Sequence, residues 1–431
     1  MDAGVPSRTS TVTNTLEQTL RAIVGDEHVR AAAAEDIVAG VRPRLVVEPG
    51  SEQELAKVLQ TAGDAGLAVI PRGGGTKLAW GNPPRRADLI LSTARLNRLI
   101  EHAWADMTAT VEAGCTLQLL QETLAQHGQR LALDPLWPAR ATVGGVLSTN
   151  DSGALRLRFG ALRDLIIGVT LALPDGTLAR SGGKVVKNVA GYDLPKLATG
   201  ALGTLGVITC AVFRLHPVPQ ARRTVSCLAR DGAEAQRFFL AIQDSKLAHS
   251  ALQVRCVAGA PAQVDILFEG VEAGLDAQTA QLKSMLAPAP LTDPGPVVWK
   301  ARQELYSAAG AGGRHAAVAK ISVLPSGIVE AIAAIMSTSE LRVRCNAVVQ
   351  ATGIGCVQLE GELAAIGAAI KSLRAELERA GGSLVVAQGA ATVPPLDAWG
   401  EAGDALPLMR AIKQQLDPVA TLNPGRFVGG I

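Results

Sequence analysis

The most informative stretch of this chain is Pro71-Arg72-Gly73-Gly74-Gly75-Thr76-Lys77. It follows the apolar run 67–70 (Leu-Ala-Val-Ile), which predicts a short buried strand. Three consecutive glycines carry no Cβ atoms, so successive backbone N–H groups can converge on an anion. Gly74 is expected to need a positive φ and to lie against that anion. The loop therefore predicts a phosphate-binding site with positive charge at both edges.

The spacing of the glycines excludes two common nucleotide loops. Leu78 takes the last glycine position of G-x-G-x-x-G, and no G-x-x-x-x-G-K-[ST] occurs in the chain. A glycine-rich turn without a ligand would have the same local sequence. Other clusters along the chain are needed to choose between the two interpretations.

The composition indicates a globular protein with a mainly aliphatic core. The 431 residues are 48% hydrophobic but only 3% aromatic, and the length is sufficient for two or three domains. The 41 basic and 39 acidic residues are spread along the chain. Without a basic stripe and interleaved aromatic residues, nucleic acid is not an expected partner.

The hydropathy pattern predicts no membrane span. The longest strongly apolar runs, 165–174 and 201–213, are shorter than the roughly 20 residues that a spanning helix needs. The polar residues 1–15 lack the apolar stretch of a signal peptide. We therefore expect a cytoplasmic protein, attached at most peripherally, through a partner, to the cytoplasmic face of the inner membrane.

The cysteine spacing argues against a metal centre within this chain. No C-x-x-C occurs among the six cysteines, so neither an iron–sulfur cluster nor a structural zinc is expected. Any such cluster would belong to another polypeptide. Each of the six is expected to be a small buried residue, namely Cys115, Cys210, Cys227, Cys256, Cys345 and Cys356.

The chain divides into four parts by pattern: a helical lead-in (1–42), a first domain (43–220), a second α+β domain (221–415) and a closing segment (416–431). Helices are predicted at 13–24 and 29–39. Ser51 and Glu54 form a capping box for a helix that ends near Ala65, between two strands. This arrangement predicts a βαβ unit that leads into the glycine loop.

Further elements follow from periodicity and turn residues. The runs 165–173 and 178–180 flank Pro174-Asp175-Gly176, which predicts a hairpin. Beyond Pro219 an antiparallel sheet covered on one side by helices is expected. Predicted strands are 88–91, 109–111, 207–215, 224–228, 253–257, 263–268, 318–323, 342–349, 357–359 and 383–386; predicted helices are 116–127, 233–242, 275–285, 301–308, 328–337, 363–380 and 406–416.

A second cluster of small residues lies at 134–153. Its glycines would let a flat ring system lie against the backbone, while hydroxyl and amide side chains offer hydrogen bonds. The alternative is a loop rich in turn formers. The residues of interest are Pro135, Thr142, Gly144, Gly145, Ser148, Asn150 and Gly153.

A third cluster spans Lys187-Asn188-Val189-Ala190-Gly191-Tyr192-Asp193-Leu194 and Gly203-Thr204-Leu205-Gly206-Val207-Ile208-Thr209. Gly206 and Ile208 could place main-chain groups against the polar edge of a ring. Tyr192 and Asp193 could serve as an acid or base, but such residues are more often structural hydrogen bonders.

Taken in order, the three clusters resemble the FAD-binding domain of the vanillyl-alcohol oxidase and p-cresol methylhydroxylase (PCMH) type, over residues 44–219. The tail from Leu416 to Arg426 is similar to the closing segment of that family. Within it, the chain resembles the FAD-binding subunits of bacterial glycolate oxidases (glycolate dehydrogenases). This narrower likeness rests on NVAGYDLPKL, GTLGVIT, Trp299 with Arg302, and Lys320-Ile321-Ser322-Val323.

The resemblance implies an α+β fold, in which a two-part PCMH-type FAD domain is followed by a ferredoxin-like cap. It implies that residues 71–77 hold the pyrophosphate of FAD and that the second and third clusters line the flavin. It also implies oxidation of a 2-hydroxy acid such as glycolate, with a second FAD subunit and an iron–sulfur subunit as partners. Because the first loop has no histidine, noncovalent FAD is expected.

The chain departs from larger relatives that oxidise 2-hydroxy acids. It lacks their late H-x-x-G-D-x-N-x-H segment, and Leu202 stands where they often have glutamate. A stand-alone oxidase of an alcohol, D-lactate or sugar acid, and a scaffold subunit with a decayed flavin site, therefore remain alternatives. No catalytic residue is assigned. The cap offers cations for an anionic substrate at Arg302, Arg314, Lys320, Arg342 and Arg344.

Overall fold

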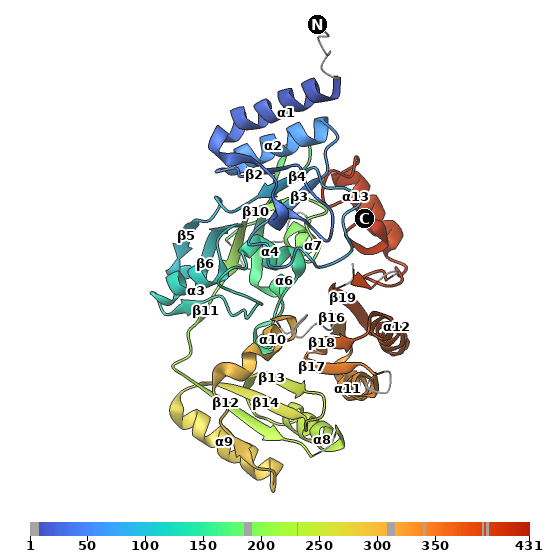
Figure 1. The fold of residues 1–431 in the computed structure, drawn as a ribbon. Coiled ribbons are helices and arrows are strands. Elements are labelled where there is room, and N and C mark those ends of the chain that lie inside the picture. The colour runs from blue at the N-terminus through green and yellow to red at the C-terminus, as the bar shows by residue number, and fades with distance from the viewer. Residues whose placement is uncertain are drawn as a thin grey trace.

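The computed structural model describes residues 8–184, 192–230, 232–307, 315–338, 342–389, 392–393 and 396–431. Within them the chain forms an α+β fold with two parts (Figure 1). The first part contains the residues before 220 and the last helix, and the second contains one large sheet with its helices. No helix in the described ranges combines the length and the apolar character that crossing a membrane requires.

The N-terminal unit is a four-stranded sheet under two helices (Figure 1). The strand order is β1-β2-β4-β3, and β4 pairs in parallel with both β2 and β3. Ser51 Oγ accepts the N–H of Glu54 at 3.1 Å, which confirms the predicted helix start. The elements are α1 (Arg8–Val24), β1 (Val29–Ala31), β2 (Leu45–Val47), α2 (Glu52–Asp64), β3 (Val69–Arg72) and β4 (Leu89–Ser92).

The helix predicted at 29–39 is wrong. Strand β1 pairs antiparallel with β2, and a short 3-10 turn, Ala34–Asp36, follows it. Asp36 is fully buried and accepts hydrogen bonds from Arg30 at 2.6 Å and from Arg72 at 2.5 Å. Helix propensity is a weak local preference, and these tertiary contacts override it in the alanine-rich segment.

The second sheet is antiparallel, with the order β5-β6-β10-β8-β9. The predicted hairpin is confirmed, because Ala172 of β8 pairs with Leu178 of β9. Residues 143–149 form a helix, α4, instead of the loop that their turn formers suggested. The elements are β5 (Leu99–Ala103), β6 (Thr108–Glu112), α3 (Leu117–Ala125), β7 (Gln129–Arg130), α4 (Val143–Thr149), α5 (Arg156–Phe159), α6 (Leu162–Leu165), β8 (Ile166–Ala172), β9 (Leu178–Gly182), α7 (Leu194–Ala198), β10 (Val207–Arg214) and β11 (His216–Pro217).

The second part, called the cap below, is built on an eight-stranded antiparallel sheet of order β15-β12-β14-β13-β17-β18-β16-β19. The order strand–helix–strand–strand–helix–strand, which is ferredoxin-like, occurs twice along the chain. The elements are β12 (Ala221–Leu228), α8 (Gly232–Gln243), β13 (His249–Cys256), β14 (Gln263–Gly270), α9 (Glu272–Leu286), β15 (Leu291–Thr292), α10 (Ala301–Ser307), β16 (His315–Ser322), α11 (Ile328–Ser337), β17 (Arg344–Gln350), β18 (Ile354–Gly361), α12 (Leu363–Arg379) and β19 (Ser383–Gln388).

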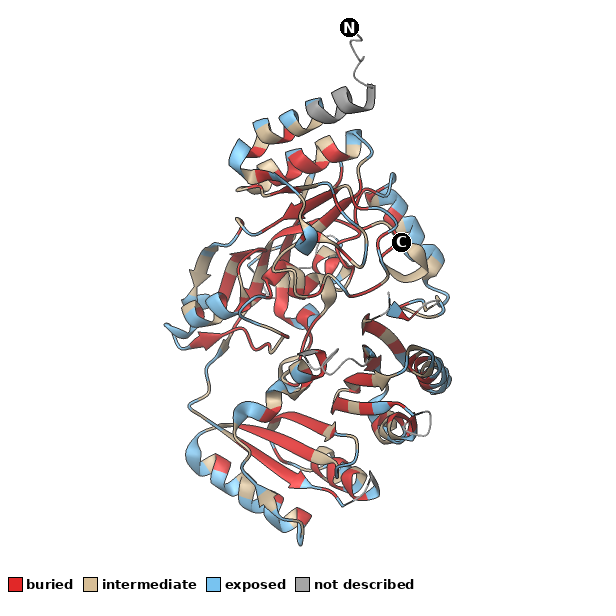
Figure 2. Cartoon of the chain, viewed as in Figure 1, coloured by how far each residue is buried: buried red, intermediate tan, exposed pale blue. Residues whose placement is uncertain are grey.

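The cap sheet is buried on both faces (Figure 2). Helices α8, α9, α11 and α12 cover one face and share its hydrophobic core. On the other face Val318 and Val348 pack in a cluster with Trp80 of the first part and Tyr306 of α10. The four helices thus cover one face as predicted, but the other face is also covered, by α10 and by the first part.

The cysteines behave as the sequence predicts. All six are free thiols, five are buried, and Cys210 is half-buried. Burial raises the pKa of the Cys256 thiol to about 11 and that of Cys345 to about 12. Thiols with pKa values this high are inert at neutral pH, so they serve here as small apolar side chains.

The closing segment runs back to the first part after α13 (Leu406–Leu416). The backbone of Val69 in β3 donates to Thr421 O at 2.7 Å and accepts from the N–H of Asn423 at 3.0 Å. The buried ammonium of Lys413 donates to Thr204 O at 2.8 Å and to Leu422 O at 3.0 Å. The last residues are therefore fixed beside β3 and the glycine loop.

Candidate functional site

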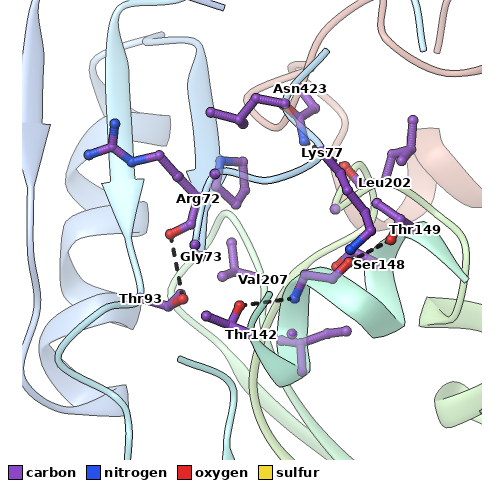
Figure 3. A pocket seen from close by; sticks show the side chains of 18 of the residues that line it. Arg72, Gly73, Lys77, Thr93, Thr142, Ser148, Thr149, Leu202, Val207 and Asn423 are labelled. Atoms are coloured by element: carbon purple, nitrogen blue, oxygen red, sulfur yellow. Dashed lines mark hydrogen bonds between the residues drawn. The ribbon is translucent and has the colours of Figure 1, made fainter. Parts of the chain in front are cut away.

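The three clusters found in the sequence meet in one pocket of the first part (Figure 3). Its walls come from β3 and its loop, from α4, from the turn before β10 and from the closing segment. The lining residues are Pro71, Arg72, Gly73, Gly74, Gly75, Thr76, Lys77, Leu78, Thr93, Thr142, Gly144, Gly145, Ser148, Thr149, Leu202, Gly203, Gly206, Val207, Ile208, Asn423 and Arg426.

The glycine loop packs tightly against the segment that leads into α4. A Cβ on Gly73 would lie 2.0 Å from Thr142 Oγ1, and one on Gly74 would lie 1.7 Å from Arg140 O. Among the three glycines only Gly75 has a positive φ, of 71°. The expectation of a positive φ at Gly74 is therefore wrong. Gly73 and Gly74 are required because the loop backbone approaches another stretch of backbone too closely for any side chain.

The two cationic side chains of the loop are paired with carboxylates. The guanidinium of Arg72 points away from the pocket (Figure 3) and donates to Asp36. The ammonium of Lys77 lies 3.1 Å from Asp151 Oδ2, and its side chain is 4% exposed. The positive charge expected at the loop edges is thus already compensated within the protein, and the peptide backbone is what the loop offers to a ligand.

Helix α4 brings the second cluster to the pocket. Thr142 caps the helix, with Oγ1 accepting the N–H of Gly145 at 3.4 Å. A Cβ on Gly144 would lie 2.9 Å from the Cβ of Ala113, so glycine allows the helix to approach the end of β6. Gly145 and Ser148 also line the pocket.

Three residues of the same cluster lie outside the pocket wall. Pro135 lines a separate groove between the first part and the cap. Gly153 donates its N–H to Asp134 at 3.0 Å, and a Cβ there would lie 2.2 Å from that carboxylate. Asn150 ends α4 with a positive φ of 46°, and its carbonyl accepts from Lys320 of the cap at 3.2 Å.

Gly206 and Ile208 of the third cluster line the pocket beside β10. Tyr192 is 89% exposed, and Asp193 caps α7 by accepting the N–H of Lys196 at 3.1 Å. Asp193 therefore has the structural hydrogen-bonding role that its residue type favours, whereas the side chain of Tyr192 lies in solvent. The stretch from Lys187 to Gly191 lies outside the described residues.

A cluster of charged residues joins the cap to the first part beside the pocket. Asp151 is its centre, and the sequence analysis did not single it out. Arg302 of α10 donates to Asp151 Oδ1 at 2.6 Å and to Asp134 O at 3.0 Å. Lys77 approaches Asp151 from the glycine loop, and Lys320 of β16 reaches the carbonyl of Asn150.

The pKa shifts in this cluster follow from burial and from the cations around Asp151. Burial alone would raise the pKa of Asp151, but Arg302 and Lys77 together hold it well below its usual range. Burial raises the pKa of Asp134 to about 6. It lowers the pKa of both Lys77 and Lys320, because an ammonium group loses its hydration there.

The structure separates the candidate cations of the cap. Arg302 and Lys320 belong to this interface cluster. Arg342 and Arg344 lie at or just before the start of β17, where both are exposed. Arg314 lies outside the described residues. A signal for Arg302 was present in its spacing from Trp299, but nothing in the sequence linked it to Asp151.

The closing segment supplies two wall residues that the sequence analysis did not assign to the site. The side chain of Asn423 donates to Leu202 O at 2.5 Å, and Arg426 donates to Leu78 O at 2.5 Å. Asn423-Pro424-Gly425-Arg426 was recognised as a family-like tail. Because this tail is far from the glycine loop in the sequence, the contact between them was not predicted.

Comparison with known proteins identifies the kind of domain that contains this pocket. Residues 43–182 match the family model described as an FAD binding domain. Glycolate oxidase subunit GlcD of Bacillus subtilis is 33% identical over 43% of this chain and 40% of its own length. D-lactate dehydrogenase of Archaeoglobus fulgidus is 36% identical over 40% of this chain and 39% of its own length. The matches thus span about 40% of these curated relatives.

The region is an FAD-binding domain, and FAD is its cofactor. The fold is that of the PCMH-type flavoproteins. The crystal structure of p-cresol methylhydroxylase with substrate bound superposes with a TM-score of 0.79 over 97% of both chains, at 17% identity. Alkyldihydroxyacetonephosphate synthase gives a TM-score of 0.73 over 99% of this chain and 87% of that chain, at 18% identity.

The pocket fits this cofactor on its own geometry. The loop between Gly73 and Gly75 carries no side chains, so its bare backbone lines the pocket. Arg426 adds a buried guanidinium that has no carboxylate partner among the described residues. A negatively charged cofactor would supply the counter-charge that this wall lacks.

Proposed function

We propose that this chain is an FAD-dependent oxidoreductase that oxidises the CH–OH group of a small 2-hydroxy acid, with glycolate to glyoxylate as the representative reaction. The observation that carries the proposal is the charge balance of the interface cluster. Lys77 and Arg302 pair with the carboxylate of Asp151, Arg302 also bonds the backbone carbonyl of Asp134, and Lys320 bonds the carbonyl of Asn150. A single carboxylate from a substrate would balance the remaining positive charge.

The pKa shifts support an anionic substrate. Both lysines have lowered pKa values because they are desolvated. A substrate carboxylate placed beside them would favour their charged forms and so raise their pKa values. When bound, FAD accepts the hydride from the substrate carbon. The cluster lies beside the FAD pocket and would orient the acid, and no residue is assigned here as the base.

We also propose that the chain acts as one FAD-bearing subunit of a hetero-oligomer, with FAD held noncovalently. A second flavoprotein subunit and an iron–sulfur subunit would complete the electron path. The chain lacks the H-x-x-G-D-x-N-x-H segment, and its cysteines lack the spacing of a cluster. The complex would be cytoplasmic, with at most peripheral membrane attachment through its partners.

The test is a binding titration of the FAD-loaded protein, followed through the visible spectrum. Glycolate should perturb the flavin bands, whereas ethylene glycol, which has the same length without a carboxylate, should bind at least tenfold more weakly. Arg302→Gln and Lys320→Gln should each raise the dissociation constant for glycolate at least tenfold. Arg344→Gln, at an exposed cation of the same sheet, is the matched control.

Equal affinity for the diol and the acid would reject the anionic substrate. An activity assay of this chain without partners tests whether it acts only as a subunit of a complex. Full activity of this chain alone with glycolate and a dye would remove the need for partners. The second candidate, a stand-alone dehydrogenase of D-lactate, is favoured by the 36% identical relative of that name, and D-lactate belongs in the same assay.

A further inference from the structure

The first part touches the cap close to the point where the chain crosses between them. The crossing is short, because β11 is followed by only residues 218–220 before β12 of the cap begins. Helix α5 packs against β13 of the cap. Leu157 of α5 contacts the hydrophobic core of the cap, and Arg158 donates to Ala248 O at 3.4 Å. The contact of β7, β11 and α5 with the cap is called the hinge interface below.

Two half-buried histidines lie in the hinge interface. The ring of His216 in β11 meets the ring of Phe159 in α5 edge to face, with centroids 4.9 Å apart. Its Nδ1 is buried and has no hydrogen-bond partner among the described residues. His249 is the first residue of β13, and its Nδ1 lies 3.1 Å from Leu247 O. Neither ring therefore has a partner that would favour its protonated form by charge.

The charged groups that face the two rings are cations. They are Arg130 of β7, Arg214 of β10 and Arg158 of α5. The carboxylate of Glu269, which pairs with Arg130 at 2.7 Å, is also shared with Arg222 at 3.1 Å. A proton on either histidine would therefore add a positive charge that the neighbouring cations repel.

The pKa values of both histidines follow from this environment. Burial lowers the pKa of His216, and two neighbouring arginines lower it further. Burial also lowers the pKa of His249; the contact with Leu247 O opposes this shift, and Arg158 adds to it. Both rings are therefore neutral at pH 7 while the cap is in place. With the cap displaced, each ring would lie in water with an ordinary pKa of about 6.5.

We propose that His216 and His249 form an acid-sensitive latch that holds the cap against the first part. The latch is closed while both rings are neutral, and protonation of either ring favours an open hinge interface. The open state binds the additional protons, so its equilibrium constant should rise up to tenfold per pH unit for each histidine as pH falls below about 6.5. Opening would also separate Arg302 of the cap from Asp151 of the first part, so acid would take the interface cluster apart.

The test measures the distance between two spin labels on the FAD-loaded protein, one on each part. Ala125 of α3 and Lys283 of α9 are exposed and can be replaced by cysteine for labelling. The six natural cysteines are buried or half-buried. Between pH 7.5 and pH 5.5 the ratio of open to closed protein should rise at least tenfold. The readout needs no substrate, so it is independent of the proposed 2-hydroxy-acid activity.

Neutral side chains at both positions should remove the response. In the double variant His216→Gln with His249→Gln, the ratio should change less than threefold over the same pH range. His315→Gln is the matched control, because His315 is an exposed histidine of the cap outside the hinge interface. It should keep the natural response. Labels whose distance does not change in the natural protein would overturn the proposal, and so would a double variant that opens as far.

Two further measurements separate the latch from unfolding and from failure of a variant to fold. The circular dichroism of the helices should stay constant between pH 7.5 and pH 5.5, and its loss over that range would reject the latch. In the natural protein, nuclear magnetic resonance of the rings of His216 and His249 should show titration below pH 6.5, together with the change in label distance. Titration at or above the ordinary pKa of about 6.5 would remove the driving force and overturn the inference.

Discussion

Asp151 illustrates how single residues join the two parts of this molecule. Its two carboxylate oxygens face Arg302 of the cap and Lys77 of the glycine loop, at 2.6 Å and 3.1 Å. One buried carboxylate therefore links the cofactor loop to the element that carries the proposed substrate cation. Asp134 lies next to the same arginine, but Arg302 bonds its backbone carbonyl and leaves its carboxylate to backbone donors.

Asp134→Asn should change how stability depends on pH. The pKa of Asp134 is raised to about 6 in the folded protein, above the value of about 3.9 in an unfolded chain. The folded state therefore binds more protons between these values, and this residue costs stability as pH rises through them. Relative to the natural protein, the asparagine variant should gain about 2 kcal/mol between pH 4 and pH 7, allowing for water in the adjoining groove.

Unfolding midpoints of both proteins, measured across that pH range, provide the comparison. Taking the difference cancels the contribution of the other carboxyl groups. A difference that is constant with pH would mean that Asp134 keeps an ordinary pKa in the folded protein.

Gly74→Val should abolish FAD retention. A Cβ at this position would lie 1.7 Å from Arg140 O, so the loop must move away from the segment that leads into α4. The visible spectrum after gel filtration should lose its flavin bands. Gly403→Val is the control, because nothing lies within 4 Å of a Cβ there. Stoichiometric FAD in the Gly74 variant would show that the loop is not the binding element.

At the scale of elements, the N-terminal segment shows the limit of local preference. The alanine-rich stretch after Val29 favours a helix, yet it forms strand β1 and a turn. Strand pairing and the buried Asp36 outweigh a preference worth only a few tenths of a kcal/mol per residue. The same carboxylate accepts a hydrogen bond from Arg72. This segment therefore also fixes the position of the first residues of the glycine loop.

Arg72→Met should therefore cost stability while affecting FAD binding little. Asp36 would keep Arg30 as a partner, at 2.6 Å, so we expect a loss of about 1–3 kcal/mol in the free energy of unfolding. The dissociation constant for FAD should rise less than threefold, because the guanidinium points away from the pocket. A rise above tenfold in a fluorescence titration would instead place this charge on the phosphates.

At the scale of the whole molecule, ion pairs and one mixed cluster fix the cap against the first part. Arg130 of β7 and Glu269 of β14 form two hydrogen bonds of 2.7 Å, and both side chains are less than 10% exposed. Trp80 stacks on Tyr306 with ring centroids 6.1 Å apart. The interface cluster beside the pocket depends on this arrangement.

Arg130→Met should lower the free energy of unfolding by about 3 kcal/mol, because it leaves the buried carboxylate of Glu269 paired with the more exposed Arg222. Denaturant titration of the FAD-loaded protein measures this loss. Lys196→Met removes an ion pair in which both side chains are more than half exposed, and should leave the free energy of unfolding almost unchanged. Equal costs would mean that the Arg130 contact does not stabilise the two-part arrangement.

Most of the fold was predictable because its signals are local. Apolar alternation and turn residues predicted the β8–β9 hairpin and every strand of the cap sheet except the two-residue β15. The cap strands formed a single sheet although no sequence repeat indicated its doubled order. Bare glycines and small residues identified the three segments that meet at the cofactor pocket.

The sequence did not predict which groups the charged side chains pair with. Nothing near Lys77 or Arg302 in the chain indicates that both face Asp151, and nothing near Arg426 indicates that it faces no carboxylate in the part of the chain that the structure describes. A glycine turn depends on its own backbone, whereas the energy of a buried charge depends on atoms brought close from distant parts of the chain. The cofactor loop was therefore visible in the sequence, and the electrostatics around it arose only on folding.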